Sequence, residues 1–266
     1  MHIYANPKRF LSLASWLTPL LFWSGLALAG GVIAYGLAPD LPRFLTAMGL
    51  QPVPPDRLMG ETVRILFIHV PAAWLGMGGW AGIAISSAAL LIWKHPLAAL
   101  SARAIAVPGL VFTLICLATG SIWGRPTWGT WWVWDGRLTS MLVLAFLYVV
   151  YLALAQAAAR EGASPRIAAI FGMVGAINIP IINRSVEWWN SLHQPPSLTA
   201  GKSSIDGVFL APLLIAVLGF SLLFAAIVLM RTRALIAQAQ IEARLRRRAL
   251  AEEPMRVAPP AMEPAL

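Results

Sequence analysis

The chain has 266 residues, of which 59% are hydrophobic and only 12% charged, and its formal net charge is +9. A mean hydropathy of +0.72 is far from that of an ordinary soluble domain and indicates a polytopic membrane protein. Much of the positive charge lies in the carboxy-terminal tail, where a topology anchor or attraction to anionic lipid explains it better than nucleic-acid binding does. No nucleic-acid partner is therefore expected.

Six apolar stretches are each long enough to cross a bilayer core of roughly 30 Å, which takes about 20 helical residues. In chain order they cover about residues 16–38, 68–93, 104–123, 138–159, 167–186 and 207–230. The first far exceeds the apolar region of about 7 to 15 residues in a secretory signal, so we expect it to be retained. Asn178 and Pro180 predict a kink in the fifth stretch. The sequence thus predicts an all-α polytopic membrane protein with six transmembrane helices.

The segments outside these stretches argue against a second folded domain. Residues 38–62 are rich in proline and are typical of an outer loop. The tail continues the last span as a basic helix and ends in APPAMEPAL, which we expect to be disordered. We therefore predict a six-helix domain over residues 1–230 and a cytoplasmic tail over 231–266. Docking of a cytoplasmic partner is an alternative use of this tail.

The basic residues predict the orientation of the chain. If the amino terminus is cytoplasmic, 13 of the 20 Lys and Arg residues lie in inner segments and 7 in outer ones. Because cytoplasmic segments of membrane proteins carry an excess of Lys and Arg, this distribution favours a cytoplasmic location for both termini. The tail supplies most of the bias, since the short loops alone are close to balanced.

The segment 123–140, WGRPTWGTWWVWDGRLTS, is the most unusual part of the chain. It holds five of the twelve tryptophans, followed directly by an acid: Trp123, Trp128, Trp131, Trp132, Trp134 and Asp135. A broad indole face with one N–H donor suits a platform for a flat aromatic ligand at a membrane surface. The positions of Trp128, Trp131, Trp132 and Asp135 follow i, i+3, i+4, i+7, so we expect a short interfacial helix with three indoles on one stripe.

The predicted topology divides the four histidines between the inner and outer faces of the membrane. His2 and His95 fall in inner segments. His69 precedes Trp93 by about 24 residues, a helix of roughly 36 Å at 1.5 Å per residue, which places it at the outer edge of the second span. His193 falls in the loop between the fifth and sixth spans. His69 and His193 are therefore expected on the same face as the tryptophans, whichever way the protein is inserted.

Two imidazoles beside a bank of indoles indicate a haem site. Neutral imidazole is a good axial donor to haem iron, and indole rings can pack on the apolar porphyrin edge. Candidate donors to the haem propionates lie nearby in the sequence: Arg125, Arg137, Arg184, Thr139 and Ser140. The alternative is an ordinary aromatic belt at the membrane interface with histidines in structural roles.

Asp135 has several potential roles. Its carboxylate could accept a hydrogen bond from a loop amide, pair with Arg137, or assist chemistry at the haem edge. A structural role is favoured, because acids beside arginines in loops usually organise the loop. Glu187 and Arg184, one turn apart near the end of the fifth span, are likewise expected to form a structural pair.

Missing motifs exclude two kinds of chemistry. Cys116 is the single cysteine and lies near the middle of the third span, where it is expected to be a small apolar filler. Without a CxxC pair, thiol-disulfide exchange and a thiolate metal site within this chain are excluded. The sequence also lacks the GxxxxGK[ST] loop that cradles nucleotide phosphates, so we do not expect the chain to hydrolyse ATP by itself.

Three signatures occur in order along the chain: FIHVPAAW around His69, WGTWWVWDGRLTS after Trp123, and SVEWWNSLHQPPSL around His193. Together they closely resemble the haem exporter protein C family, CcmC, of the bacterial cytochrome c maturation system. The tryptophan-rich segment resembles the WWD domain shared by a superfamily of haem-handling membrane proteins. The resemblance runs from about residue 16 to 230 and includes neither the first ten residues nor the tail.

This resemblance implies a subunit of the bacterial inner membrane that presents haem b at the periplasmic face. It implies transfer of the haem to the chaperone CcmE, with the ATPase CcmA, the permease CcmB and the small membrane protein CcmD as partners. His69 and His193 match the two axial positions of the family, and the segment from Trp123 to Asp135 matches its haem-contacting loop. Arg137 is the neighbouring candidate for a propionate.

Two other classes of protein remain as alternatives. A cytochrome c haem lyase-like enzyme would share a WWD loop, but it would normally need a larger outer region than the loop of about 25 residues between the first two spans. A haem-containing quinone oxidoreductase subunit would need haem sites at both faces, whereas two histidines at one face provide one haem.

Overall fold

The computed structural model describes residues 7–38, 47, 49, 52–57, 59–189, 191, 193, 198–199 and 202–257. The elements are α1 (Pro7–Leu37), the 3₁₀ helix η1 (Glu61–Ile65), α3 (Leu66–Trp93), α4 (Pro96–Trp128), α5 (Gly136–Arg160), α6 (Arg166–Gly175), α7 (Asn178–Trp188), β1 (Leu198–Thr199), β2 (Lys202–Ser203) and α8 (Gly207–Val257). β1 and β2 form only a two-residue antiparallel ladder. The predicted all-α architecture is confirmed.

Six helical segments are long and apolar enough to cross a membrane, and they correspond to the six predicted spans. Large apolar side chains point outward along them, for example Trp23 (65% exposed), Ile85 (72%) and Phe146 (62%). A soluble bundle would bury such residues, whereas lipid solvates them. Most of the helices extend past the predicted spans, and the third, α4, runs about five residues beyond the expected end at 123.

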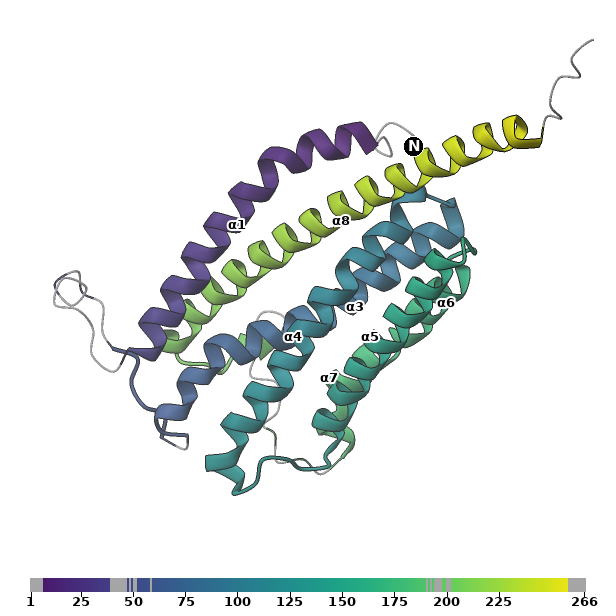
Figure 1. The fold of residues 1–266 in the computed structure, drawn as a ribbon. Helices are drawn as coiled ribbons and strands as arrows, with labels where there is room; N and C mark the ends of the chain where they lie inside the picture. The colour runs from purple at the N-terminus through teal and green to yellow at the C-terminus, as the bar shows by residue number, and fades with distance from the viewer. Residues whose placement is uncertain are drawn as a thin grey trace, which may run out of the picture.

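The helices form three neighbouring groups (Figure 1). α1 packs along α8, α3 packs against α4, and α5 packs against α6 and α7, with α3 and α4 between the other two groups. Gly25 and Gly219 permit the close approach of α1 to α8. A Cβ on Gly25 would lie 2.7 Å from the backbone N of Leu223, and one on Gly219 would lie 2.5 Å from the backbone N of Ala29. Small residues at such crossings let membrane helices pack backbone to backbone.

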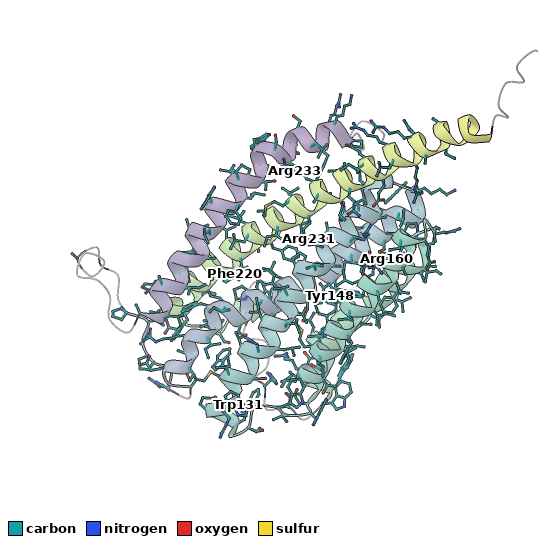
Figure 2. The ribbon with its side chains drawn as sticks, viewed as in Figure 1. Trp131, Tyr148, Arg160, Phe220, Arg231 and Arg233 are labelled. Atoms are coloured by element: carbon teal, nitrogen blue, oxygen red, sulfur yellow. The ribbon has the colours of Figure 1, made fainter. Side chains whose placement is uncertain are left out.

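An aromatic core joins the central helices. The ring of Trp80 packs edge to face against that of Tyr148, with a centroid distance of 4.9 Å, and both side chains are fully buried. The Tyr148 hydroxyl donates to the Gly76 carbonyl at 2.7 Å, linking α5 to α3. Cys116 is buried in the same core, as expected for an apolar filler. Figure 2 shows Tyr148 midway along the bundle, away from Trp131.

The fifth span is interrupted between α6 and α7, where Asn178 and Pro180 predict a kink. The amides of Ala176 and Ile177 bond to carbonyls three residues earlier, which tightens the turn. The buried Asn178 side chain donates to the Ser140 carbonyl of α5 at 2.9 Å. The polar residue therefore serves helix packing.

The last helix, α8, continues well past the predicted end of its span and extends beyond the bundle (Figure 1). The helical first part of the predicted tail is thus present. The expected disordered end, residues 258–266, lies outside the described residues, as do His2 and about half of the predicted outer loop 38–62.

At the α3 end of that loop, the buried Arg64 side chain holds neighbouring segments together. Its guanidinium donates to the carbonyls of Gly36 and Val53 at 2.8 and 2.9 Å and pairs with Glu61 at 2.6 Å.

Candidate functional site

The tryptophan segment does not form the expected short interfacial helix. α4 runs through Trp123 to Trp128, residues 129–135 have no helical structure, and α5 begins at Gly136. The prediction fails because Gly129 adopts a left-handed conformation (φ 76°) that ends α4, while Asp135 caps the start of α5. The Trp128, Trp131, Trp132 and Asp135 stripe therefore does not exist.

His69 lies in the first turn of α3, at the same end of the bundle as this segment. Its Nδ1 is 3.0 Å from the hydroxyl of Thr119 on α4, and that hydroxyl is 2.6 Å from the carbonyl of Ile115. Because the hydroxyl donates to Ile115, it accepts the Nδ1–H of His69. This assignment leaves the Nε2 lone pair of His69 available to a ligand.

His193 follows α7 and is held by Asp135, which is far away in the sequence, and by the nearby Ser191. Its Nδ1 lies 2.6 Å from Oδ2 of Asp135, and its backbone N–H donates to the Ser191 hydroxyl at 3.1 Å. Since a carboxylate can only accept, Nδ1 of His193 carries the proton and Nε2 again keeps its lone pair. Burial lowers the pKa of His193 and outweighs the contribution of Asp135, so the imidazole is neutral at pH 7.

Asp135 has a structural role, and its main partner is not Arg137. One carboxylate oxygen accepts the Leu138 amide at 2.8 Å and caps α5, and the other accepts from Ser191 at 2.5 Å and from His193. Burial raises the pKa of this carboxyl, but the three hydrogen bonds outweigh burial and hold the pKa below its ordinary value. The carboxylate is thus ionised beside a neutral imidazole.

Two tryptophans pack on the two imidazoles. Trp123 meets His69 edge to face with ring centroids 5.6 Å apart, and Trp128 meets His193 in the same way at 4.7 Å. His69 and His193 are also near enough to interact electrostatically. The structure therefore brings together the two histidines and the two tryptophans at the end of α4.

The remaining tryptophans lie on the connection that follows. Trp131 and Trp134 are 59% and 76% exposed, and the Arg125 guanidinium lies 5.9 Å above the Trp131 ring. Trp132 packs against Trp134 with centroids 5.4 Å apart. Among the described residues, none of these three indoles makes a ring contact with either imidazole.

The candidate propionate donors differ in their surroundings. Arg137 acts electrostatically on both histidines and on Asp135, so it lies within the site. Arg184 is exposed and pairs with Glu187 at 2.8 Å, as predicted for a structural pair. The Ser140 hydroxyl donates to the Gly136 carbonyl within α5. Of the donors considered from the sequence, Arg137 is the best placed.

Sequence reasoning missed Thr119 and Ser191. Thr119 precedes Trp123 by one helical turn, a spacing that puts the hydroxyl and the indole on one face of α4. Ser191 stands two residues before His193, where a hydroxyl commonly bonds the backbone N–H two residues on. Both spacings can be read in the sequence, but neither shows which histidine nitrogen forms a hydrogen bond with the hydroxyl.

The donor set fits haem better than a bare metal ion. Among the described residues, no group of three or more His, Cys, Asp or Glu side chains is arranged to hold an ion. Two imidazoles suffice for haem, because the porphyrin supplies the equatorial ligands. The indole N–H groups of Trp123 and Trp132 are buried without an acceptor in the described part of the chain. A haem carboxylate is an acceptor of the kind that such groups require.

Comparison with known proteins gives consistent matches. The family model described as "Heme exporter protein C" matches residues 1–247. The chain is 46% identical over 225 residues to "Heme exporter protein C" of Bradyrhizobium diazoefficiens, covering 84% of this chain and 80% of that protein. The protein of the same name from Escherichia coli is 41% identical over 238 residues, covering 89% and 90%. A cytochrome c biosynthesis ccmC-like mitochondrial protein of Marchantia polymorpha is 43% identical over 197 residues, covering 73% and 84%.

Proposed function

Because the chain belongs to the haem exporter protein C family, we propose that it presents haem at the periplasmic face and passes it to the haem chaperone CcmE. Family membership confirms the resemblance seen in the sequence motifs. It also agrees with a multi-pass protein of the bacterial inner membrane that acts in haem export and cytochrome c maturation and is not itself an enzyme.

The pair of anchored histidines carries this proposal. Each imidazole commits Nδ1–H to the protein, His69 to Thr119 and His193 to Asp135. A fixed Nδ1–H sets the tautomer and aims Nε2 away from its anchor, which is the arrangement that metal-ligating histidines use. His69 and His193 are thus the axial ligands of one non-covalently held haem, a b-type haem.

The tryptophans and Arg137 supply the rest of the binding surface. Trp123 and Trp128 fix the imidazole rings from the side, and Trp131, Trp132 and Trp134 offer indole faces to the porphyrin edge. Arg137 supplies the positive charge that a propionate requires. The exposed Trp131 and Trp134 are accessible to an incoming chaperone.

Charge supports the periplasmic assignment of the site. Figure 2 shows Arg160, Arg231 and Arg233 toward the opposite end of the bundle from Trp131. Cytoplasmic ends of membrane proteins are the basic ones, so the tryptophan end faces the periplasm and both termini face the cytoplasm. The basic part of α8 then extends into the cytoplasm.

We assign the energy supply for haem transfer to partner subunits. The chain carries no phosphate-binding loop of its own. We assign ATP hydrolysis to CcmA, with CcmB as its permease and CcmD as a small membrane subunit of the same ABC-type complex. This chain contributes the haem site and not the nucleotide site.

The test is absorbance spectroscopy of the detergent-purified chain loaded with haem. The expected spectrum is that of six-coordinate low-spin haem, and His69→Ala and His193→Ala should each lose one strong-field ligand and recover it with added imidazole. His95→Ala is the matched control, because the His95 side chain only caps α4. Normal spectra and full haem content in both site variants would refute the assignment.

A further inference from the structure

We infer that Arg103, Arg231 and Ser87 form a binding site for the phosphate of an anionic phospholipid, at the end of the bundle opposite the tryptophans. Arg103 belongs to α4, Arg231 to α8 and Ser87 to α3. A lipid bound here would hold three helices together. The site is separate from the proposed haem site and does not depend on it.

Both arginines lie at the depth of the lipid headgroups. Arg103 precedes Trp123 on α4 by about 20 residues, a helix of roughly 30 Å, which is the thickness of the hydrocarbon core. Arg231 lies about 24 residues after Gly207, the first residue of α8, which is roughly 36 Å of helix. Figure 2 shows Arg231 toward the opposite end of the bundle from Trp131. Lipid phosphates lie at this level, just outside the hydrocarbon.

The two guanidinium groups lie close together. Nε of Arg231 donates to the carbonyl of Ala104, the residue after Arg103, at 3.1 Å, and the two positive charges interact electrostatically. Both side chains are half-buried. Among the described residues, the ion pairs with acidic side chains involve neither arginine. Two like charges held together in a partly dehydrated position repel each other, so an anion bound between them is stabilising.

A small cavity beside Arg103 exposes a further hydrogen-bond donor. It measures about 20 Å³, enough for about one water molecule, and both Arg103 and Ser87 line it. The Ser87 side chain is 1% exposed, and its hydroxyl has no hydrogen-bond partner in the described part of the chain. None of the described residues that line the cavity is acidic. A phosphate oxygen accepts from such a hydroxyl, either directly or through one water molecule.

The surroundings of the cavity favour a lipid over a soluble anion. Its walls are mainly alanine and other apolar side chains of α3, α4, α5 and α6. Next to them along the chain, Ile92, Trp93 and Ile167 are 65%, 59% and 70% exposed, and acyl chains would cover these side chains. Basic pockets between transmembrane helices are known to bind anionic headgroups.

The experiment measures the affinity of the purified full chain for phosphatidylglycerol in neutral detergent, from the rise in melting temperature as the lipid is added. Phosphatidylglycerol should stabilise the protein, whereas phosphatidylcholine and inorganic phosphate at the same concentration should not. Arg103→Gln and Arg231→Gln should each weaken the apparent Kd about fivefold, the effect of one basic residue near an anionic surface. Arg233→Gln is the matched control, because Arg233 lies at the same end of the bundle (Figure 2) but two residues further along α8, on another side of the helix.

Two variants keep the test valid if Arg231→Gln unfolds through loss of its bond to Ala104. Arg103→Gln removes the repulsion between the two arginines, so without lipid its melting temperature should equal or exceed that of the unsubstituted chain. Ser87→Ala removes a buried hydroxyl and should likewise remain stable without lipid, while its affinity for phosphatidylglycerol falls about two- to fivefold.

Three results would overturn the inference. An unchanged Kd in Arg103→Gln would remove the arginine from the site, and an equal loss in Arg233→Gln would indicate diffuse attraction to a basic surface. Equal stabilisation by inorganic phosphate would show that the ligand is a soluble anion. Haem takes no part in the measurement, so each of these results leaves the proposed function untouched.

Discussion

The carboxylate of Asp135 lies 2.6 Å from Nδ1 of His193, although 58 positions separate the two residues in the sequence. The contact links the start of α5 to the segment that follows α7. It also explains why an acid directly follows the tryptophans: the same carboxylate caps α5 and orients a histidine. The tryptophan connection and the His193 segment are thus parts of one site.

Trp128 is expected to matter more for haem retention than Trp131. Its ring centroid is 4.7 Å from that of His193, whereas Trp131 is 59% exposed. Trp128→Ala should cost about 1 kcal/mol of haem binding beyond simple burial. Haem retention after gel filtration of the two single variants measures the difference. An equal loss in both would contradict a specific role for the Trp128 and His193 contact.

Changing Trp128, Trp131 and Trp132 together to Ala should lower both haem retention and the loading of CcmE. The protein should remain inserted, because these indoles lie at the end of the bundle and not in its aromatic core. Membrane fractionation provides the insertion control. Loading of CcmE at the normal rate would instead identify the segment as a plain interfacial belt.

The approach of α1 to α8 predicts a difference between two glycines of α1. Gly25→Ala would place a Cβ 2.7 Å from the Leu223 backbone N, while a Cβ on Gly30 meets nothing within 4 Å. Overpacking should cost Gly25→Ala about 1 to 3 kcal/mol, and Gly30→Ala should be neutral or slightly stabilising. Thermal unfolding in detergent compares them. Equal melting temperatures of the two variants would show that α1 shifts to accommodate the Cβ at position 25 without loss of stability.

Asn178 lies at the interruption of the fifth span, and we expect Asn178→Ala to lower the stability of the protein moderately. This variant loses the hydrogen bond to the Ser140 carbonyl, and interhelical hydrogen bonds in membranes contribute about 0.6 kcal/mol on average and about 1.7 at most. Ile177→Ala, at a neighbouring position that is 63% exposed, is the control. Denaturant titration measures the change in stability. Haem affinity should be measured on the same variants, because α7 leads to His193, a proposed haem ligand. An unchanged stability would exclude a packing role for this amide.

Division of labour among the subunits can be tested by co-expression. This chain and CcmE alone should give covalent haem on CcmE, since no described side chain at the site other than the two proposed ligands is an evident nucleophile. Release of the loaded chaperone should then require the ATPase subunit. Electrophoresis under denaturing conditions with haem staining locates the adduct. A denaturation-resistant adduct on this chain would favour a lyase-like enzyme.

Composition and local pattern were enough to predict the membrane fold. Lipid cannot form hydrogen bonds with exposed backbone N–H and C=O groups, so a long apolar stretch that crosses a membrane has to be a helix. All six spans were predicted from the sequence, and their ends differ from the ends of the observed helices by a few turns or fewer, apart from the long extension of α8. The interruption near Asn178 was also predicted from the sequence, because Pro180 lacks the N–H that would bond the carbonyl of Ala176 four residues earlier. The placement of His69 at the tryptophan end followed from helix rise alone.

The internal arrangement of the site was decided by tertiary structure. The i, i+3, i+4, i+7 spacing of Trp128, Trp131, Trp132 and Asp135 predicted a helix, but Gly129 ends α4 and the capping carboxylate of Asp135 begins a new one. Spacing describes only neighbours along one helix. The hydrogen bonds that His69 donates to Thr119 and that His193 donates to Asp135 join residues 50 and 58 positions apart, and only the packing of separate helices selects such partners.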